Sequence, residues 1–344
     1  MDNAKGYKAF KPGMICRDKQ YAENTDYEEV SGKICEKGMM HYCVNPFDVL
    51  NFYDLVDESG KFSDFAKVKA LDQPISSSGG KFATKKLHIG AKLSFAGFIK
   101  ACIDYTKEQT IVNMPKSDVA TGDYAKIGSS GNYAKIGSSG DSAQIGSSGN
   151  SAKIGSSGDY AQIGSSGNSA KIGSSGNSAK IGSSGDYAKI GSSGDYAQIG
   201  SSGYSAQIGS SGYYAKIGSS GYYAQIGSSG YSAKIGSSGD YAQIGSSGDY
   251  AQIGSSGYYA KIGSSGDYAQ IDSTGVDSVI CCAGRGCTVK AKIGSWITLA
   301  EWEYSEEKGR SVPRCVKTEY VDGEKIKPDT WYQLKNGEFV EVNR

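Results

Sequence analysis

The sequence is poor in the residues that stiffen loops and supply catalytic imidazoles. Among 344 residues there are 6 Pro, 3 Trp and 2 His, and neither sign of charge predominates, because 37 Lys and Arg face 36 Asp and Glu. A net charge of +1 argues against the electrostatic attraction that holds nucleic acid or anionic lipid. We therefore expect neither a nucleic-acid partner nor a membrane.

Long apolar runs and cysteine pairs are also missing. No stretch of about 18 apolar residues occurs, and the start, MDNAKGYKAFKPG, lacks the basic segment and apolar core of a secretory leader. The eight cysteines form no CxxC pair; they lie at Cys16, Cys35, Cys43, Cys102, Cys281, Cys282, Cys287 and Cys315. We expect a cytoplasmic protein, or one released without a standard signal, with mostly structural thiols.

What the sequence has is glycine, 49 residues of it, much of it in one repeated phrase. The nine-residue unit reads x-[Tyr/Ser]-Ala-[Lys/Gln]-Ile-Gly-Ser-Ser-Gly, where x is Asp, Asn or Tyr, and seventeen units run from Asp123 to Gly275. A flexible Gly/Ser linker would not keep so strict a period, whereas repeats of this length are typical of solenoids. The sequence therefore predicts a mainly β fold built on a β-solenoid.

Each unit is expected to supply one short strand and one corner. Ala and Ile, two residues apart, should face inward, with Tyr/Ser and Lys/Gln facing outward, and Gly-Ser-Ser-Gly should turn the corner with residues that tolerate positive φ. A single unit cannot enclose a core, so we expect two units, 18 residues, in each coil. At roughly 4.8 Å per layer, the repeats would form a rod of about 40 Å.

Two ligand classes known for flat or Gly-rich solenoids fit the repeat poorly. A calcium β-roll, the main alternative fold, needs a carboxylate in every turn, but the x site is Asp in only eight units. Ice binding would require regular rows of Thr. We assign no metal and no cofactor.

Tyrosine makes the outward surface distinctive. Tyr fills the second site in eleven units, and from Gly203 to Ser232 it also fills the x site. Tyr offers contact area and a hydroxyl at modest entropic cost, so we predict a binding surface for a protein partner. Its residues are Tyr204, Tyr213, Tyr214, Tyr222, Tyr223 and Tyr231. The alternative is that the rings stack only to stiffen the rod.

The flanks have ordinary composition and predict two further domains. Residues 1–115 should form a small α+β domain with a short helix capped by Asn45 and Pro46, a longer helix opened by Ser94, and strands over 61–71 and 81–93. Residues 116–275 would be the solenoid. Residues 276–344 should form a C-terminal β cap, in which AKIGSW repeats the strand once more before turns at Asp322-Gly323 and Asn336-Gly337. Cys281, Cys282 and Cys287 should fill this cap.

The N-terminal cysteines allow two chemical hypotheses. Cys35, His41 and Cys43 lie close together in CEKGMMHYC, with Cys16 upstream, and such residues can bind zinc or form a nucleophilic Cys/His pair. The spacing matches no known zinc finger, and no third catalytic partner is evident. We assign no catalytic or metal-binding residue.

The two flanks together resemble a known family. The segments YKAFKPGMICRDKQYAENTDYEE, CEKGMMHYCVNPFDVLNFYDL and KLHIGAKLSFAGFIKACIDYT precede the repeats, and KAKIGSWITLAEWEY and VDGEKIKPDTWYQLKNGEFVEV follow them. They are similar to an uncharacterised family of Gly-rich repeat proteins of phages and prophages of gut bacteria. Members of that family carry repeats such as GAATAG where this chain carries AKIGSSG. The resemblance implies a phage-associated accessory protein and no established activity.

Three functions compete at this stage. The first is a non-enzymatic protein whose rigid solenoid presents Tyr/Ser and Lys/Gln rows to a host or phage protein, such as a host defence component; the rod could also form a homodimer along one face. The second is a structural spacer or virion fibre component. The third is an enzyme housed in residues 1–115.

Overall fold

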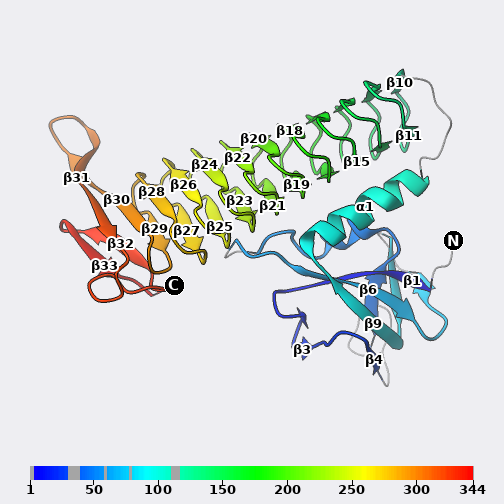
Figure 1. Cartoon of the computed structure of the whole chain (residues 1–344), viewed down its shortest axis with the longest axis horizontal. Helices are drawn as coiled ribbons and strands as arrows, with labels where there is room; N and C mark the ends of the chain where they lie inside the picture. The colour runs from blue at the N-terminus through cyan, green and yellow to red at the C-terminus, as the bar shows by residue number, and fades with distance from the viewer. Residues whose placement is uncertain (1–3, 30–38, 58–59, 77–79, 110–116, 344) are drawn as a thin grey trace.

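The computed structural model describes residues 4–29, 39–57, 60–76, 80–109 and 117–343. Figure 1 shows three parts: an N-terminal sheet domain with one long helix, a straight rod of short strands, and a cap of longer strands at the far end of the rod. The N-terminal domain lies alongside the rod rather than at its end, so that the helix α1 (Phe95–Gln109) runs next to the strands. The fold is mainly β, with a solenoid of about ten coils over residues 126–299.

The rod consists of two parallel sheets, and successive units alternate between them. Strands pair with the strand 18 residues later, as in Ile127 with Ile145, so two units form one coil as predicted. The first sheet contains β11 (Lys126–Ser129), β13 (Gln144–Ser147), β15 (Gln162–Ser165), β17 (Lys180–Ser183), β19 (Gln198–Ser201), β21 (Lys216–Ser219), β23 (Lys234–Ser237), β25 (Gln252–Ser255), β27 (Gln270–Ser273) and β29 (Thr288–Lys290).

The second sheet lies on the other side of the core. It contains β10 (Ser117–Ala120), β12 (Lys135–Ser138), β14 (Lys153–Ser156), β16 (Lys171–Ser174), β18 (Lys189–Ser192), β20 (Gln207–Ser210), β22 (Gln225–Ser228), β24 (Gln243–Ser246), β26 (Lys261–Ser264), β28 (Val279–Cys282) and β30 (Trp296–Ser305). At roughly 4.8 Å per layer, ten coils make a rod of about 48 Å.

The core between the sheets is narrow and regular. From the second unit onward the Ala side chain is fully buried, and in every unit Ile is at most 4% exposed and the first Ser of Gly-Ser-Ser-Gly also points inward. These three residues alternate with Lys/Gln and Gly, which point outward, because neighbouring side chains on a strand face opposite sides. The predicted inward Ala and Ile are confirmed, and the inward Ser is an addition.

The corners differ from the prediction. The first Gly and Ser of Gly-Ser-Ser-Gly belong to the strand, and the second-site Tyr or Ser lies in the turn, where Tyr124 and Ser142 both have φ of 57°. None of the described glycines between residues 123 and 275 has positive φ. The last Gly of each unit is needed instead for close approach: a Cβ on Gly140 would overlap the carbonyl oxygen of Gly122, one coil earlier. Glycine allows the coils to stack.

The x site links one coil to the next. The Asp141 amide donates to Asp123 Oδ1 at 2.9 Å, and the Asn150 amide donates to Asn132 Oδ1 at 3.0 Å. The same bond recurs wherever the residue one coil earlier is Asp or Asn, because only these side chains bring an acceptor back to the neighbouring backbone. Two such ladders follow the two edges of the rod.

The N-terminal domain is a seven-stranded antiparallel sheet. Its strand order is β4 (Thr25–Glu28), β9 (Lys86–Leu93), β6 (Asp64–Ala70), β1 (Lys5–Phe10), β5 (Met40–Cys43), β8 (Lys81–Thr84) and β7 (Ile75–Ser76), and β2 (Ile15–Cys16) and β3 (Lys19–Gln20) form a separate hairpin. The strands predicted over 61–71 and 81–93 are present, the second as the pair β8 and β9. One face of the sheet has its own core and the other packs against two helices.

Both helices begin where the capping residues predicted. The short helix η1 (Pro46–Asn51) is 3-10 rather than α, and Asn45 Oδ1 accepts from the Phe47 amide at 3.0 Å. In α1 the Ser94 hydroxyl accepts from the Gly97 amide at 3.1 Å. Side-chain acceptors satisfy amides that a helix start leaves unpaired, which is why sequence alone located these ends.

The C-terminal cap changes from parallel to antiparallel pairing. Strand β30 pairs with β31 (Arg310–Tyr320), and β29 pairs with β32 (Tyr332–Lys335), which forms a hairpin with β33 (Glu338–Glu341). The Asn336-Gly337 turn, with φ of 52° and 73°, closes this hairpin as predicted. The Asp322-Gly323 turn lies in the loop between β31 and β32 and joins no paired strands.

The transition to the cap also corrects a prediction. AKIGSW does not repeat the strand, because Ile293 and Gly294 form a turn there and Ile293 is 50% exposed. The rod instead continues through β28 and β29, where Ile280 pairs with Ile262 and Val289 with Ile271. Cys282 and Cys287 are buried in this coil as expected, whereas Cys281 is exposed on the outer surface.

Candidate functional site

The outward glycines form a flat stripe along each sheet of the rod, and the N-terminal domain covers one of them. Over this covered face, from β15 to β25, atoms of α1, η1 or the loop after η1 lie within 4 Å of where a Cβ on each outward glycine would be. A Cβ on Gly218, for example, would lie 2.8 Å from Phe62 Cε1 and 3.0 Å from Phe95 Cζ. Glycine is therefore the residue that lets the domain lie directly on the sheet.

The Lys/Gln row of the covered face holds the domain through polar contacts. Gln162 Oε1 accepts from Asn45 Nδ2 at 3.1 Å, Gln198 Nε2 donates to the Leu50 carbonyl at 3.1 Å, and Lys216 pairs with Asp54. Between them, Lys180 is buried, and its ammonium donates to the Phe47 carbonyl at 3.1 Å and to Asn51 Oδ1 at 2.6 Å.

Lys180 is enclosed tightly enough to shift its pKa. Burial lowers the pKa of Lys180, and the carboxylate of Asp48 opposes that shift. Burial likewise raises the pKa of Asp48, while Lys180 and hydrogen bonds from Gln162 and Asn45 oppose it. The two groups thus stabilise each other's charge in a dry interface, where an uncompensated charge would be costly.

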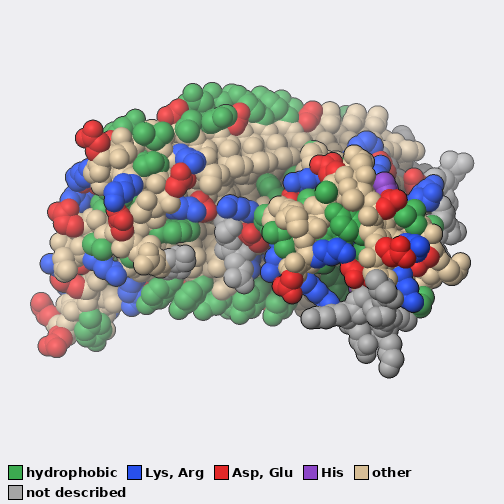
Figure 2. Space-filling model, turned by 90° about the horizontal axis from the view of Figure 1, so that it is seen from below, with side chains coloured by type: hydrophobic (Ala, Val, Ile, Leu, Met, Phe, Trp, Pro, Cys, Tyr) green, Lys and Arg blue, Asp and Glu red, His purple; other side chains and the backbone are tan. Residues whose placement is uncertain are grey.

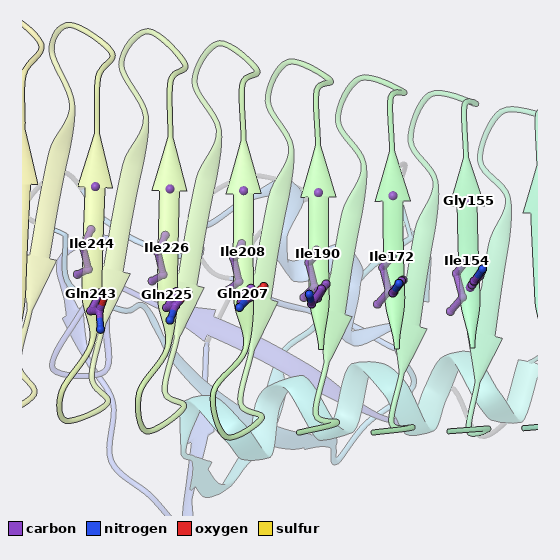
Figure 3. A pocket seen from close by; sticks show the side chains of 18 of the residues that line it. Ile154, Gly155, Ile172, Ile190, Gln207, Ile208, Gln225, Ile226, Gln243 and Ile244 are labelled. Atoms are coloured by element: carbon purple, nitrogen blue, oxygen red, sulfur yellow. The ribbon is translucent and has the colours of Figure 1, made fainter. Parts of the chain in front are cut away.

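The equivalent stripe on the second sheet is open. Seven of its glycines have no atom within 4 Å of where a Cβ would lie: Gly155, Gly173, Gly191, Gly209, Gly227, Gly245 and Gly263. This open face forms a shallow groove of about 1530 Å³ that runs from Lys135 to Cys281. Figure 3 shows its regularity, with Gln207, Gln225 and Gln243 in one row across successive strands.

The open face has two chemically different halves. Its outward row begins with four exposed lysines, continues with three glutamines and ends with a lysine: Lys135, Lys153, Lys171, Lys189, Gln207, Gln225, Gln243 and Lys261. None of the four leading lysines takes part in an ion pair within the described part of the chain. Exposed serines, such as Ser193 and Ser211, follow the strands on the other side of the glycines.

The tyrosines form two ladders, because successive turns lie on opposite edges of the rod. Figure 2 shows hydrophobic side chains, tyrosine included, in two rows along these edges. The six predicted binding residues are divided between them. One edge carries Tyr204, Tyr222 and Tyr223, joined by ring contacts of 4.5–5.8 Å; the other carries Tyr213, Tyr214 and Tyr231.

The ladders interrupt the hydrogen-bonded links between coils. Where x is Tyr, the side chain accepts no hydrogen bond from the next coil. The Asp and Asn bonds between coils described above therefore stop beyond Tyr204 and Tyr213 and resume at Tyr258. Ring contacts such as Tyr222 with Tyr241, at 5.3 Å between centroids, replace them. The predicted tyrosines, from Tyr204 to Tyr231, belong to the same coils as Gln207 and Gln225, so on each edge they lie beside the glutamine half of the open face.

A smaller cavity of about 280 Å³ lies in the N-terminal domain, lined by residues of the paired strands β1 and β5 among others. It brings together Cys16, His41 and Cys43, whereas Cys35 lies outside the described residues. No group of three His, Cys, Asp or Glu side chains suited to a metal ion occurs among the described residues. The lining also includes Lys8, whose ammonium donates to the His41 carbonyl at 2.9 Å.

The ionisation of these groups disfavours a reactive Cys/His pair. Burial, followed by the charge of Asp48, raises the pKa of Cys43 to about 12. Burial, followed by the charges of Lys81 and Lys8, lowers the pKa of His41 to about 4. A neutral thiol is a weak nucleophile, because the thiolate is the reactive form, so at neutral pH this cavity holds an unreactive thiol and an uncharged imidazole.

Residues 4–101 match the family model of a domain of unknown function (DUF7666). The match covers the N-terminal sheet and the first part of α1, less than a third of the chain. No curated protein and no solved structure matches the chain. The longest described helix, α1, has 15 residues, and no described helix has the length and apolarity required to cross a bilayer.

Proposed function

We propose that this protein is a non-enzymatic binding scaffold, and that the open face of its rod, bordered by the two Tyr ladders, docks a protein partner. The observation that supports this most strongly is that two faces with nearly the same sequence differ in whether they are covered. Both present the same glycine stripe, but the chain's own N-terminal domain occupies only one. The flat stripe of glycines, called the floor from here on, carries a docked domain on one face of this molecule, so its exposed copy is the best candidate for contact with another protein.

The tyrosines support the same proposal. At positive φ, Asn, Asp or Gly would cost less than Tyr, and in the x site Tyr gives up the hydrogen bond that Asp or Asn makes. Eleven second-site tyrosines and five x-site tyrosines therefore sit where local backbone stability favours another residue. Exposed aromatic clusters of this kind are typical of protein interfaces.

The partner is proposed to be a host protein met by a phage-encoded accessory factor in the cytoplasm, for example a defence component. This step is supported by the resemblance of the two flanks to phage and prophage repeat proteins. It is independent of the surface argument, which would hold for a partner of any origin.

The test compares two sets of variants in affinity capture from infected host lysate, followed by circular dichroism to verify folding. Gly191→Val with Gly209→Val fills the open floor, and Tyr204→Ser with Tyr222→Ser and Tyr223→Ser removes one cluster. The control is Tyr124→Ser with Tyr133→Ser and Tyr160→Ser, which removes three tyrosines that are at least 62% exposed. A partner held by the wild type and control but lost with the floor variant is expected. Equal capture by all four proteins would contradict the proposal and favour a spacer.

A further inference from the structure

The covered face shows what kind of element fits a glycine stripe, and this inference rests on the proposed function of the open one. Helix α1 lies along the rod axis and contacts β13, β15, β17 and β19 in turn. Its residues Phe95 and Ile99 lie at Gly200, and Ile103 and Thr106 lie at Gly164. One helical turn thus advances about one layer, because a pitch of about 5.4 Å is close to a layer spacing of about 4.8 Å.

The open face offers the same track at greater length. From Lys135 to Lys261 it has eight layers, about 34 Å, which is the length of a helix of about 22 residues. An added strand is a poorer fit, because each strand of this face is already hydrogen-bonded on both sides within the sheet. Bulky apolar side chains repeated at every helical turn would fill the floor, as Ile99 and Ile103 do on the covered side.

The charges of the open face determine which residues of a bound helix must flank its apolar residues. Lys153, Lys171 and Lys189 stack at about 4.8 Å, and no carboxylate of the described residues pairs with them, so like charges repel along the row. On the covered face the docked element supplies the partners: Asp54 pairs with Lys216, and the Phe47 carbonyl and Asn51 accept from Lys180. The occupant of the open face therefore needs carboxylates opposite the lysine half and neutral polar groups opposite the glutamines.

We infer that the open face binds an acidic amphipathic helix of the partner protein, laid along the rod axis with its carboxylates over Lys135 to Lys189. Apolar residues at one position per turn contact the glycine floor. The tyrosine clusters border the other half of the same track and contact the neutral end of the helix.

The test uses two designed helical peptides of 22 residues with the same stripe of Ile and Leu. One carries Glu and the other Gln at the positions flanking the stripe in one half. Fluorescence anisotropy with the intact protein should show the Glu peptide binding at least tenfold more tightly, with an affinity that falls as salt rises. Lys153→Glu with Lys171→Glu should abolish that preference, whereas Lys126→Glu, an exposed lysine on the other sheet, should leave it unchanged.

Gly191→Val supplies the second readout, since it blocks the floor without changing charge, and both peptides should then bind at least tenfold more weakly. Equal affinity for the two peptides, or a preference that survives the double lysine variant, would overturn the acidic helix. If neither peptide binds while Gly191→Val with Gly209→Val still releases the captured partner, the helix is wrong but the docking function stands. If the floor variants change neither peptide binding nor capture, both proposals fail.

Discussion

The glycine stripe makes a sharp prediction because two of its members share the same local sequence. Gly218 and Gly191 each lie within AKIGSSG, one on the covered face and one on the open face. A valine at either position has the same effect on local strand propensity. Any difference between Gly218→Val and Gly191→Val must therefore come from what covers the residue.

The structure gives the size of that difference. A Cβ on Gly218 would lie 2.8 Å from Phe62 Cε1, 3.0 Å from Phe95 Cζ and 3.2 Å from Leu55 Cδ2, all tighter than ordinary contacts, and the two methyl groups of valine lie beyond it. Overpacking of this kind costs about 1–3 kcal/mol. Gly191 has no atom within 4 Å of its Cβ position, and valine should stabilise an exposed strand by up to about 1 kcal/mol relative to glycine.

Calorimetry distinguishes these outcomes. Undocking would expose Ile99, Phe62 and their neighbours, so the N-terminal domain should unfold at a lower temperature in Gly218→Val, by about 10 °C for about 2 kcal/mol. All three tryptophans lie between Trp296 and Trp331, in the cap, so tryptophan fluorescence reports the far end of the rod and should be unchanged. Equal destabilisation by the two variants would refute the claim that glycine on the covered face is required for docking.

Three further predictions concern the rod itself. Ser192→Ala should raise stability by about 1 kcal/mol in urea unfolding, because the buried Ser192 hydroxyl has no hydrogen-bond partner within the described structure. Tyr133→Asn should stabilise by about 1 kcal/mol by easing a φ of 61° at a 76% exposed residue, whereas Tyr223→Asn, which removes ring contacts to Tyr222 and Tyr241, should not. Partial desolvation by the surrounding rings, followed by the charge of the neighbouring Tyr241, raises the pKa of Tyr222 from 10.0 to about 12. The unfolded chain therefore loses this proton first, so denaturant midpoints should fall from pH 10 to pH 12, and less steeply in Tyr222→Phe.

The repeat fixed the main architecture in advance because a strict period constrains every layer at once. Inward Ile and Ala, the 18-residue coil and the two helix starts at Asn45 and Ser94 all follow from local rules. The corner was assigned wrongly because Gly tolerates positive φ far better than Tyr does, so Gly-Ser-Ser-Gly was placed in the turn and Tyr on the strand. Stacking decided the matter: a Cβ on the last Gly of a unit would strike the coil before it, which leaves the turn to Tyr or Ser.

The candidate site was only partly accessible from the sequence. The division of the tyrosines could have been found, since separating odd from even units places Tyr222 and Tyr231 on different edges. The difference between Gly191 and Gly218 could not, because the two heptapeptides are identical and only the docked domain distinguishes them. The last coil was missed because SVICC and CTVK share with the repeat only the position of one buried aliphatic residue.

The polar contacts of the covered face also determine on which layers of the rod the N-terminal domain docks. A glycine floor is the same at every layer, so by itself it would let the N-terminal domain settle one layer too early or too late. The outward row beneath the domain reads Gln162, Lys180, Gln198, Lys216, and along the whole covered sheet that order occurs once. A shift of one layer in one direction would leave Asp54 facing the Gln198 amide instead of the Lys216 ammonium. A shift in the other direction would place the Asn45 amide, which now donates to Gln162, against the Lys180 ammonium, which cannot accept. The variation between Lys and Gln therefore specifies a single register for the N-terminal domain on an otherwise repetitive rod.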